Sequence, residues 1–182
     1  MTACAVRQRL AELRAVEFSL DRVSALTVAG MDLSRLRSFD DLTAAQRETL
    51  ATAARTGNVP VELELIVRAR NPSINSTTAE LFALDWLLLL NERETTTGKL
   101  DRRVQILPGR EVELPLRARL NLVEFFGRDE HVLLDVLKAS IGERGLPINL
   151  ALRATPRVGT TYGPMGTSAP VVIARRVVAS EF

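Results

Sequence analysis

Cysteine and histidine are almost missing from this chain of 182 residues, which contains one of each. A single cysteine, Cys4, can build neither an internal disulfide framework nor a thiolate metal site. A single histidine, His131, excludes a histidine metal cluster, and any Ser-His-Asp arrangement would have to use it. Because His131 stands beside Glu130 near the start of a predicted helix, we expect it at the solvated surface. The sequence therefore predicts a chain that is not an enzyme and that binds no metal and no cofactor.

Long apolar runs and an excess of charge are also missing. The longest apolar run, Leu81 to Leu90, is interrupted by Asp85 and is far shorter than the roughly 20 residues needed to cross a bilayer. The chain has 24 Lys and Arg against 22 Asp and Glu, and so small an excess does not indicate a nucleic-acid partner. The glycines at 159, 163 and 166 follow no strand-to-helix pattern, so they do not form a phosphate-binding loop.

What the sequence does contain is a series of strand-like alternations. The clearest runs from Val61 to Ala69, where apolar residues alternate with Glu and Arg between Pro60 and Asn71-Pro72. Leu81 to Leu90 is apolar on both faces except at Asp85, which predicts a central strand covered on both sides. Further strands are expected at residues 18–28 with a slip near Asp21-Arg22, and at 100–106, 112–122, 146–154 and 171–179.

Helices and turns interrupt these strands. A first helix is capped by Asp41 or Thr43, turns Leu42, Leu50 and Ala53 or Ala54 inward, and ends at Gly57-Asn58; a second spans Asp129 to Ile141. Residues 91–98 are expected to be a polar turn and residues 156–170 a loop. About seven strands, with two helices that do not alternate with them, predict a mainly β antiparallel sandwich. We expect one domain over residues 17–182.

Residues 1–16 form an N-terminal segment outside this domain. Met1-Thr2-Ala3-Cys4 resembles the end of a bacterial lipobox, in which small residues before a cysteine let enzymes reach the thiol for diacylation. The charged and apolar regions of such a signal would lie upstream of Met1. We therefore expect a lipid on Cys4, a tether over residues 6–16 and a bacterial cell-envelope location, with the membrane surface as partner. The alternative is an incidental cysteine with small neighbours, which would indicate a cytoplasmic protein.

Carboxylates are the remaining candidates for chemistry, because glycoside hydrolysis needs only two of them. Glu62 and Glu64 share one strand face, as do Glu111 and Glu113, and such alternation is usual on a solvated face. Asp85, beside Trp86 in an apolar run, could have a perturbed pKa or could pair with an arginine or a backbone amide. Arginines of the late strands could form a basic face, although interspersed glutamates favour a mixed surface; they are Arg117, Arg119, Arg153, Arg175 and Arg176.

The segment from Val61 to about Leu122 resembles the group 2 late embryogenesis abundant (LEA) family, also called the water-stress and hypersensitive-response (WHy) domain. The resemblance rests on an alternating strand that runs into Asn-Pro, a Leu-Asp-aromatic strand, a polar turn reaching Gly, an Ile-Pro-Gly-like turn and a Val/Leu-Pro-Leu strand. The family often has a second Asn directly after Asn-Pro, whereas this chain has Ser73 there and Asn75 two positions on. The matching residues here are Asn71, Pro72, Leu84, Asp85, Trp86, Gly98, Ile106, Pro108, Gly109 and the strand from Val112 to Leu116.

The resemblance implies an immunoglobulin-like or fibronectin-III-like sandwich whose family-like core covers residues 59–125. It implies a role in desiccation or other stress and brings no catalytic residues with it. The long first strand, the inserted helix and Cys4 look like the bacterial lipoprotein branch of the family. We therefore expect a protective or binding module that binds or shields envelope proteins, the membrane surface or an anionic ligand. One alternative is a carrier of a lipid or other hydrophobic ligand within the sandwich, and another is a carboxylate-dependent hydrolase.

Overall fold

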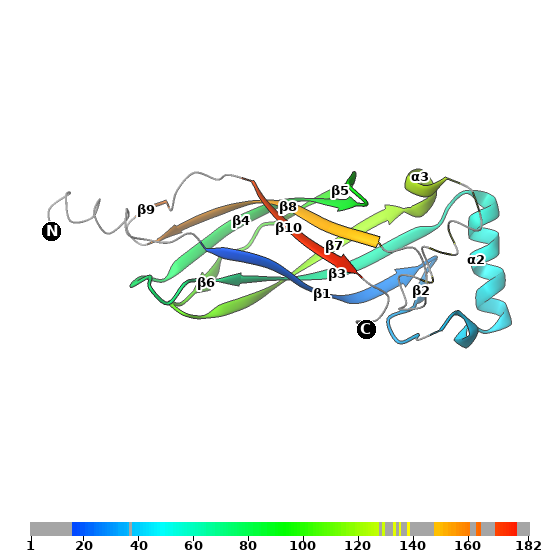
Figure 1. Cartoon of the computed structure of the whole chain (residues 1–182), viewed down its shortest axis with the longest axis horizontal. Coiled ribbons are helices and arrows are strands. Elements are labelled where there is room, and N and C mark those ends of the chain that lie inside the picture. Colours follow the sequence, from blue (N-terminus) through cyan, green and yellow to red (C-terminus); the bar gives the residue numbers. More distant parts are fainter. Residues whose placement is uncertain are drawn as a thin grey trace, which may run out of the picture.

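Two antiparallel β-sheets make up most of the chain in the computed structural model (Figure 1). The structure describes residues 16–36, 38–127, 129, 133, 135, 138, 148–160, 163–164 and 170–177. The mainly β antiparallel sandwich predicted from the sequence is therefore confirmed. Ten strands lie within these described ranges, rather than about seven, because one of the expected strands is divided and two short pairing segments are added.

The first sheet has four strands in the order β2-β1-β3-β7. β1 shows register shifts between Leu20 and Arg22 and between Val23 and Ala25, which confirms the predicted slip near Asp21-Arg22. β3 begins at Pro60 and stops before Asn71-Pro72, as the alternation predicts. Its strands are β1 (Glu17–Val28), β2 (Met31–Asp32), β3 (Pro60–Arg70) and β7 (Glu111–Asn121).

The second sheet has the order β10-β8-β4-β5, with β6 beside β4 and β9 beside β8. β4 is its central strand, as predicted, but its two faces are not equally covered. The side chains that face the first sheet are buried, whereas on the other face Phe82 is 36% exposed and Asp85 and Leu87 are half-buried. Its strands are β4 (Ala79–Leu90), β5 (Arg93–Leu100), β6 (Val104–Ile106), β8 (Ile148–Thr160), β9 (Gly163–Pro164) and β10 (Val171–Val177).

Two predicted loops are strands in the structure. The polar stretch 91–98 is a turn only at Asn91 and Glu92, whose positive φ values of 48° and 66° suit a two-residue hairpin. The threonines that follow favour a strand, so β5 begins at once, and the expected strand 100–106 is divided between β5 and β6. β8 also continues to Thr160, although the sequence predicts a loop from Pro156. Proline is tolerated there because, among the described strands, β10 pairs with β8 only as far as Ala154 and β9 only from Gly159, so neither pairs with Pro156.

The first predicted helix is confirmed as α2 (Ala44–Thr56). The Thr43 hydroxyl accepts a hydrogen bond from the Gln46 amide at 3.3 Å, and the Gln46 side chain accepts one from the Thr43 amide at 2.9 Å. The helix ends at Gly57, where φ is +73°. Leu50 is buried and Ala53 and Ala54 pack against the core, as expected.

The second predicted helix, Asp129 to Ile141, lies largely outside the described residues. Leu133 is helical there, and its amide donates to the Asp129 carbonyl at 3.0 Å. A different short helix, α3 (Leu122–Phe126), begins where the strand 112–122 was expected to end. The strand stops one residue early because the Asn121 side chain accepts a hydrogen bond from the Val123 amide at 3.3 Å and caps the helix.

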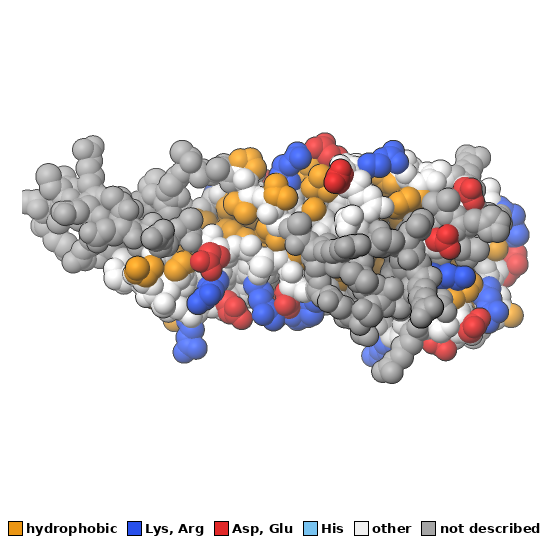
Figure 2. All heavy atoms as spheres, in the orientation of Figure 1, with side chains coloured by type: hydrophobic (Ala, Val, Ile, Leu, Met, Phe, Trp, Pro, Cys, Tyr) orange, Lys and Arg blue, Asp and Glu red, His pale blue; other side chains and the backbone are white. Residues whose placement is uncertain are grey.

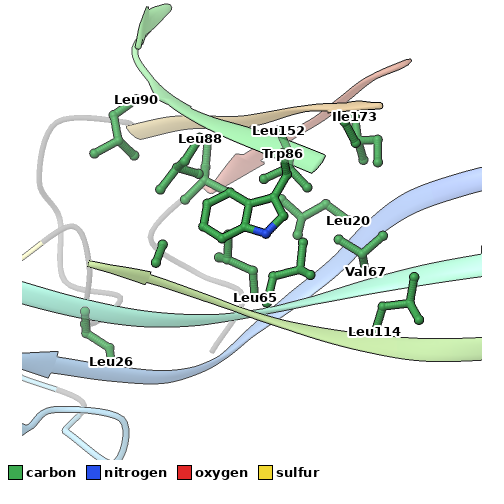
Figure 3. Close-up of a cluster of buried hydrophobic side chains, with 14 of the residues drawn as sticks. Leu20, Leu26, Leu65, Val67, Trp86, Leu88, Leu90, Leu114, Leu152 and Ile173 are labelled. Carbon is green, nitrogen blue, oxygen red and sulfur yellow. The ribbon is translucent and has the colours of Figure 1, made fainter. Parts of the chain in front are cut away.

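The core fills the space between the sheets. Figure 3 shows Trp86 of β4 among leucine and valine side chains that come from both sheets. Leu65, Leu84, Leu88 and Leu152 are completely buried within this continuous apolar cluster. Burial of so many leucines supplies most of the stability of the sandwich.

The two ends of the sandwich differ. α2 lies across one end (Figure 1). At the opposite end β3 turns into β4 and β6 leads into β7, and there Glu17, the first residue of β1, pairs with Arg70, the last residue of β3. The segment 1–15, which precedes the described residues, therefore joins the sandwich at the end opposite α2.

Candidate functional site

Asn71 connects the two sheets at the end of the sandwich opposite α2. Its side chain is fully buried, and its amide nitrogen donates to the carbonyl oxygens of Thr77, at 3.0 Å, and Ile106, at 2.9 Å. Its side-chain oxygen accepts a hydrogen bond from Asn75 Nδ2 at 2.6 Å. One asparagine thus joins the end of β3 to the loop 72–78 and to β6, and we name this group of residues 71–78 and 106–110 the Asn71 corner.

The backbone of the same corner is also hydrogen-bonded. The Asn71 amide donates to the Arg110 carbonyl at 3.0 Å, and the Gly109 amide donates to the Asn71 carbonyl at 2.8 Å. Pro108 and Gly109, with φ of +71° at the glycine and a hydrogen bond from the Arg110 amide to the Leu107 carbonyl, have the signature of a type II turn. Asn71, Pro72, Pro108 and Gly109, predicted as one family motif, therefore meet in space.

Trp86 and Gly98 form a second contact between predicted motif residues. They lie opposite each other on β4 and β5, and a Cβ atom added to Gly98 would lie 2.1 Å from Cζ2 of the indole. The indole is only 6% exposed, so it has little room to move away. Gly98 is therefore required by the close approach of the ring and not by an unusual φ angle.

Asp85 lies apart from both contacts. Its carboxylate is 42% exposed on the outer face of the second sheet and is 3.4 Å from the guanidinium of Arg157. Of the interpretations open to the sequence, pairing with an arginine is the one that the structure shows. Asp85 is thus neither deeply buried nor paired with a second carboxylate in the described contacts.

The other candidate carboxylates are neutralised across the first sheet. Antiparallel pairing of β3 with β7 places Glu62 opposite Arg119 and Glu64 opposite Arg117, with N···O distances of 3.1 and 3.4 Å. Further along the same strands the order of signs is reversed, since Arg68 and Arg70 lie opposite Glu113 and Glu111. We name these four opposed pairs of β3 and β7 the charge ladder.

The late arginines whose side chains the structure describes do not form the basic face that the sequence left open. Arg117 and Arg119 belong to the charge ladder, and Arg153 lies 2.9 Å from Glu94. The side chains of Arg175 and Arg176 lie outside the described ones, as do Cys4 and His131. A mixed surface is what the described arginines form.

Glu113 has the clearest electrostatic environment on this face. Arg22 donates from Nη1 to one of its carboxylate oxygens at 2.9 Å and from Nη2 to the other at 3.0 Å. These two hydrogen bonds hold the pKa of Glu113 below its usual range. Similar bonds from Arg55 and Ser34 lower the pKa values of Glu48 and Asp32.

We expect acid to remove the stabilisation that Glu113 provides. Because its pKa is lower in the folded chain, the stabilisation is complete above the usual carboxyl value of 4.5 and is lost as pH falls through the lower folded value. Urea unfolding of wild type and Glu113→Gln should therefore show a difference at pH 7 that shrinks at pH 3. Glu124→Gln, a control on α3, should show no such convergence. A difference in unfolding free energy that persists at pH 3 would contradict the role of the Arg22–Glu113 pair. The difference at pH 7 should be small, because the pair is solvent-exposed.

A hollow of about 480 Å³ runs along the seam between β5 and β7. Its walls combine apolar and charged groups, and its carboxylate, that of Glu64, is bound by Arg117 and by the Ser24 hydroxyl at 2.8 Å. It lies at the surface of a filled core, whereas a lipid carrier requires an apolar cavity between the sheets. The carrier hypothesis stays an untested alternative. The lining residues are Glu64, Trp86, Gly98, Lys99, Leu100, Arg102, Pro115, Leu116 and Arg117.

No three His, Cys, Asp or Glu side chains among the described residues are grouped to hold a metal ion. No helix in the described ranges is long and apolar enough to cross a bilayer.

Comparison with known proteins supports the class of fold. No protein-family model and no curated protein matches the sequence. The Arabidopsis thaliana protein AT1g01470 has a similar solution structure, with a TM-score of 0.50 and 14% identity over 94% of this chain and 88% of that one. At this identity the likeness concerns the fold alone, and it places the chain with β-sandwiches of this kind.

Two looser likenesses complete the comparison. One is to a "putative late embryogenesis abundant (LEA) protein", at a TM-score of 0.46 and 10% identity over 95% of this chain and 75% of that one. Another is to a protein from Archaeoglobus fulgidus, at 0.38 and 13% identity over 90% and 93%. One of these neighbours is thus described as a LEA protein, but TM-scores this low carry no argument about this chain. The bacterial lipoprotein branch stays a prediction.

Two features of the Asn71 corner were missed in the sequence. Asn75 does not stand where the family places its second asparagine, yet it is 2% exposed and bonded to Asn71. Ile74 and Leu107 are 72% and 56% exposed, although large apolar residues are usually buried. Their exposure could have been predicted from the sequence, because each is an apolar residue within a turn sequence, Pro-Ser-Ile-Asn or Leu-Pro-Gly.

Proposed function

We propose that this chain is a non-catalytic stress-protection module of the LEA type 2 kind, held at the bacterial cell envelope by a lipid on Cys4. The observation that supports it best is that the family-motif residues occupy structural positions. Asn71, Pro108 and Gly109 join the two sheets, and Gly98 accommodates Trp86. These motif residues therefore build a scaffold, and the candidate carboxylates Glu62, Glu64 and Asp85 are each paired with an arginine.

The exposed charge ladder gives this scaffold a physical means of protection. The side chains of Arg117 and Arg119 are 84% and 79% exposed, and an exposed ion pair contributes at most about 1 kcal/mol. Such arginines can exchange one carboxylate for another at little cost. As water is withdrawn, they offer replacement hydrogen bonds to carboxylates or phosphates of neighbouring macromolecules.

Drying tests the proposed protection. Lactate dehydrogenase dried with the purified chain should retain more activity after rehydration than the enzyme dried with an equal mass of serum albumin. The double variant Arg117→Gln with Arg119→Gln should protect less, while its melting temperature stays near that of wild type because the lost pairs are exposed. Protection no better than that of albumin would refute the stress-protection role.

Mass spectrometry tests the proposed anchor separately. Protein isolated from its own cells should carry diacylglycerol on the Cys4 thiol, and Cys4→Ser should move from the membrane to the soluble fraction. An unmodified Cys4 would contradict the envelope location and favour a cytoplasmic stress protein. The drying assay uses unacylated protein, so each half of the proposal can fail without the other.

A further inference from the structure

We propose that the Asn71 corner is a membrane-contacting tip, which rests its apolar side chains in the interface of an anionic bilayer. The proposal deepens the envelope role above and rests on it for the location of the protein. It depends on three observations at this end of the sandwich: exposed apolar side chains, neighbouring arginines, and the place where the tether joins.

Ile74 and Leu107 are the apolar contacts. They are 72% and 56% exposed, and they stand on two loops that touch, since a Cβ on Gly109 would lie 3.4 Å from Cβ of Ser73. Hydrogen bonds from Asn71 to Ile106 and from Asn75 to Asn71 hold both loops in place. Figure 2 shows hydrophobic side chains at the surface of this left-hand end. Apolar side chains held on a rigid loop can enter a bilayer interface without a further cost of ordering.

Arginines lie beside these side chains. Segments 71–78 and 102–110 contain Arg102, Arg103 and Arg110, and the acids that flank them are paired: Glu80 with Arg103, Asp101 with Lys99 and Glu111 with Arg68. Arg103 is 76% exposed, lies 3.8 Å from Glu80 and stacks over the Phe82 ring, with 5.5 Å between guanidinium carbon and ring centroid. Cations beside apolar side chains are the pattern that binds anionic lipid headgroups.

The direction of the chain agrees with this contact. Glu17 pairs with Arg70 at the edge of the Asn71 corner, so the tether enters the domain at this end. Glu17 stands thirteen positions after Cys4, and a chain of that length can extend over roughly 45 Å at most. A lipid on Cys4 would therefore hold the domain by this end. The tip would then orient the domain while the lipid holds it.

Fluorescence of labelled cysteines tests the contact without the anchor. In a Cys4→Ser background, Ile74→Cys and Leu107→Cys are each labelled with an environment-sensitive dye and mixed with phosphatidylcholine and phosphatidylglycerol vesicles. Both are expected to shift to the blue, and the shift should be absent with phosphatidylcholine alone. Ala45→Cys, exposed on α2 at the opposite end, is the matched control and should not shift.

Flotation of unlabelled Cys4→Ser protein with the same vesicles measures affinity. Replacing Arg102→Gln and Arg110→Gln together should weaken binding by roughly tenfold or more, since each arginine near an anionic surface contributes roughly fivefold. Ile74→Ser with Leu107→Ser should also weaken it, whereas Val172→Ser, which removes an apolar side chain 66% exposed on β10, should not.

Two fluorescence results would overturn the proposed membrane contact: no spectral shift at either loop, or an equal shift at position 45. A shift that follows protein concentration without vesicles would also overturn it, because it would indicate contact with a second copy of the chain. None of them bears on acylation of Cys4 or on the drying assay. Failure of the tip is therefore distinguishable from failure of the proposed function.

Discussion

Replacing Asn71 with alanine is expected to lower the free energy of unfolding by about 3–5 kcal/mol. The substitution leaves the carbonyl oxygens of Thr77 and Ile106 and the amide of Asn75 without their partner. Asn71 is fully buried, so water cannot replace these bonds freely. Each buried polar group left without a partner costs about 1–3 kcal/mol.

Urea unfolding followed by circular dichroism measures this loss. Asn75→Ala is the graded control, because it removes one of the three side-chain bonds and should cost about 1–2 kcal/mol. Asn71→Asp keeps the size of the side chain but loses the two donated bonds, so it should resemble alanine more than wild type. If Asn71→Ala cost no more than Asn75→Ala, the corner would not depend on Asn71.

Replacing Gly98 with alanine is expected to cost about 3 kcal/mol, the upper part of the usual range for overpacking a core. The added methyl group would lie within 2.1–2.8 Å of three indole carbons of Trp86. The indole is rigid and almost fully buried, so the strand or the ring must shift as a whole. In a strand without this neighbour, alanine would be better than glycine by about 0.5–1 kcal/mol.

A double-mutant cycle separates the clash from any other effect. Trp86→Leu destabilises the core by itself, but in that background Gly98→Ala should cost less than about 0.5 kcal/mol or become stabilising. Thermal unfolding of the four proteins gives the coupling between the two sites. A full cost of Gly98→Ala in the Trp86→Leu background would show that the indole is not the cause.

The strands were predictable where hydrophobic alternation is uninterrupted. β3 and the slip within β1 could be located from the sequence, because most apolar residues there belong to the core. β5 could not, since its residues are mostly polar and its place is determined by pairing with β4. The continuation of β8 past Pro156 depends on how far β10 reaches, and that is a property of the assembled sheet.

The candidate site was predictable as a set of residues but not as an arrangement. Nothing in the sequence indicates that Asn71 and Ile106, which are 35 positions apart, are in hydrogen-bond contact. Asn75 departs from the family spacing, and only the geometry of the loop brings its side chain back to Asn71. The partners of Asp85 and Glu64 were likewise unavailable, since cross-strand register decides which arginine lies opposite.

The charge ladder also protects the pairing of β3 and β7 from slipping. Hydrophobic alternation forbids a slip of one residue, which would turn the apolar side chains outward, but it permits a slip of an even number. Both strands carry their charges in the order Glu, Glu, Arg, Arg, so only the observed register satisfies all four pairs. A slip of four residues would place Glu64 against Glu113 or Arg68 against Arg117, and like charges in such positions repel. The surface of the sheet thereby encodes an alignment that its core alone leaves ambiguous.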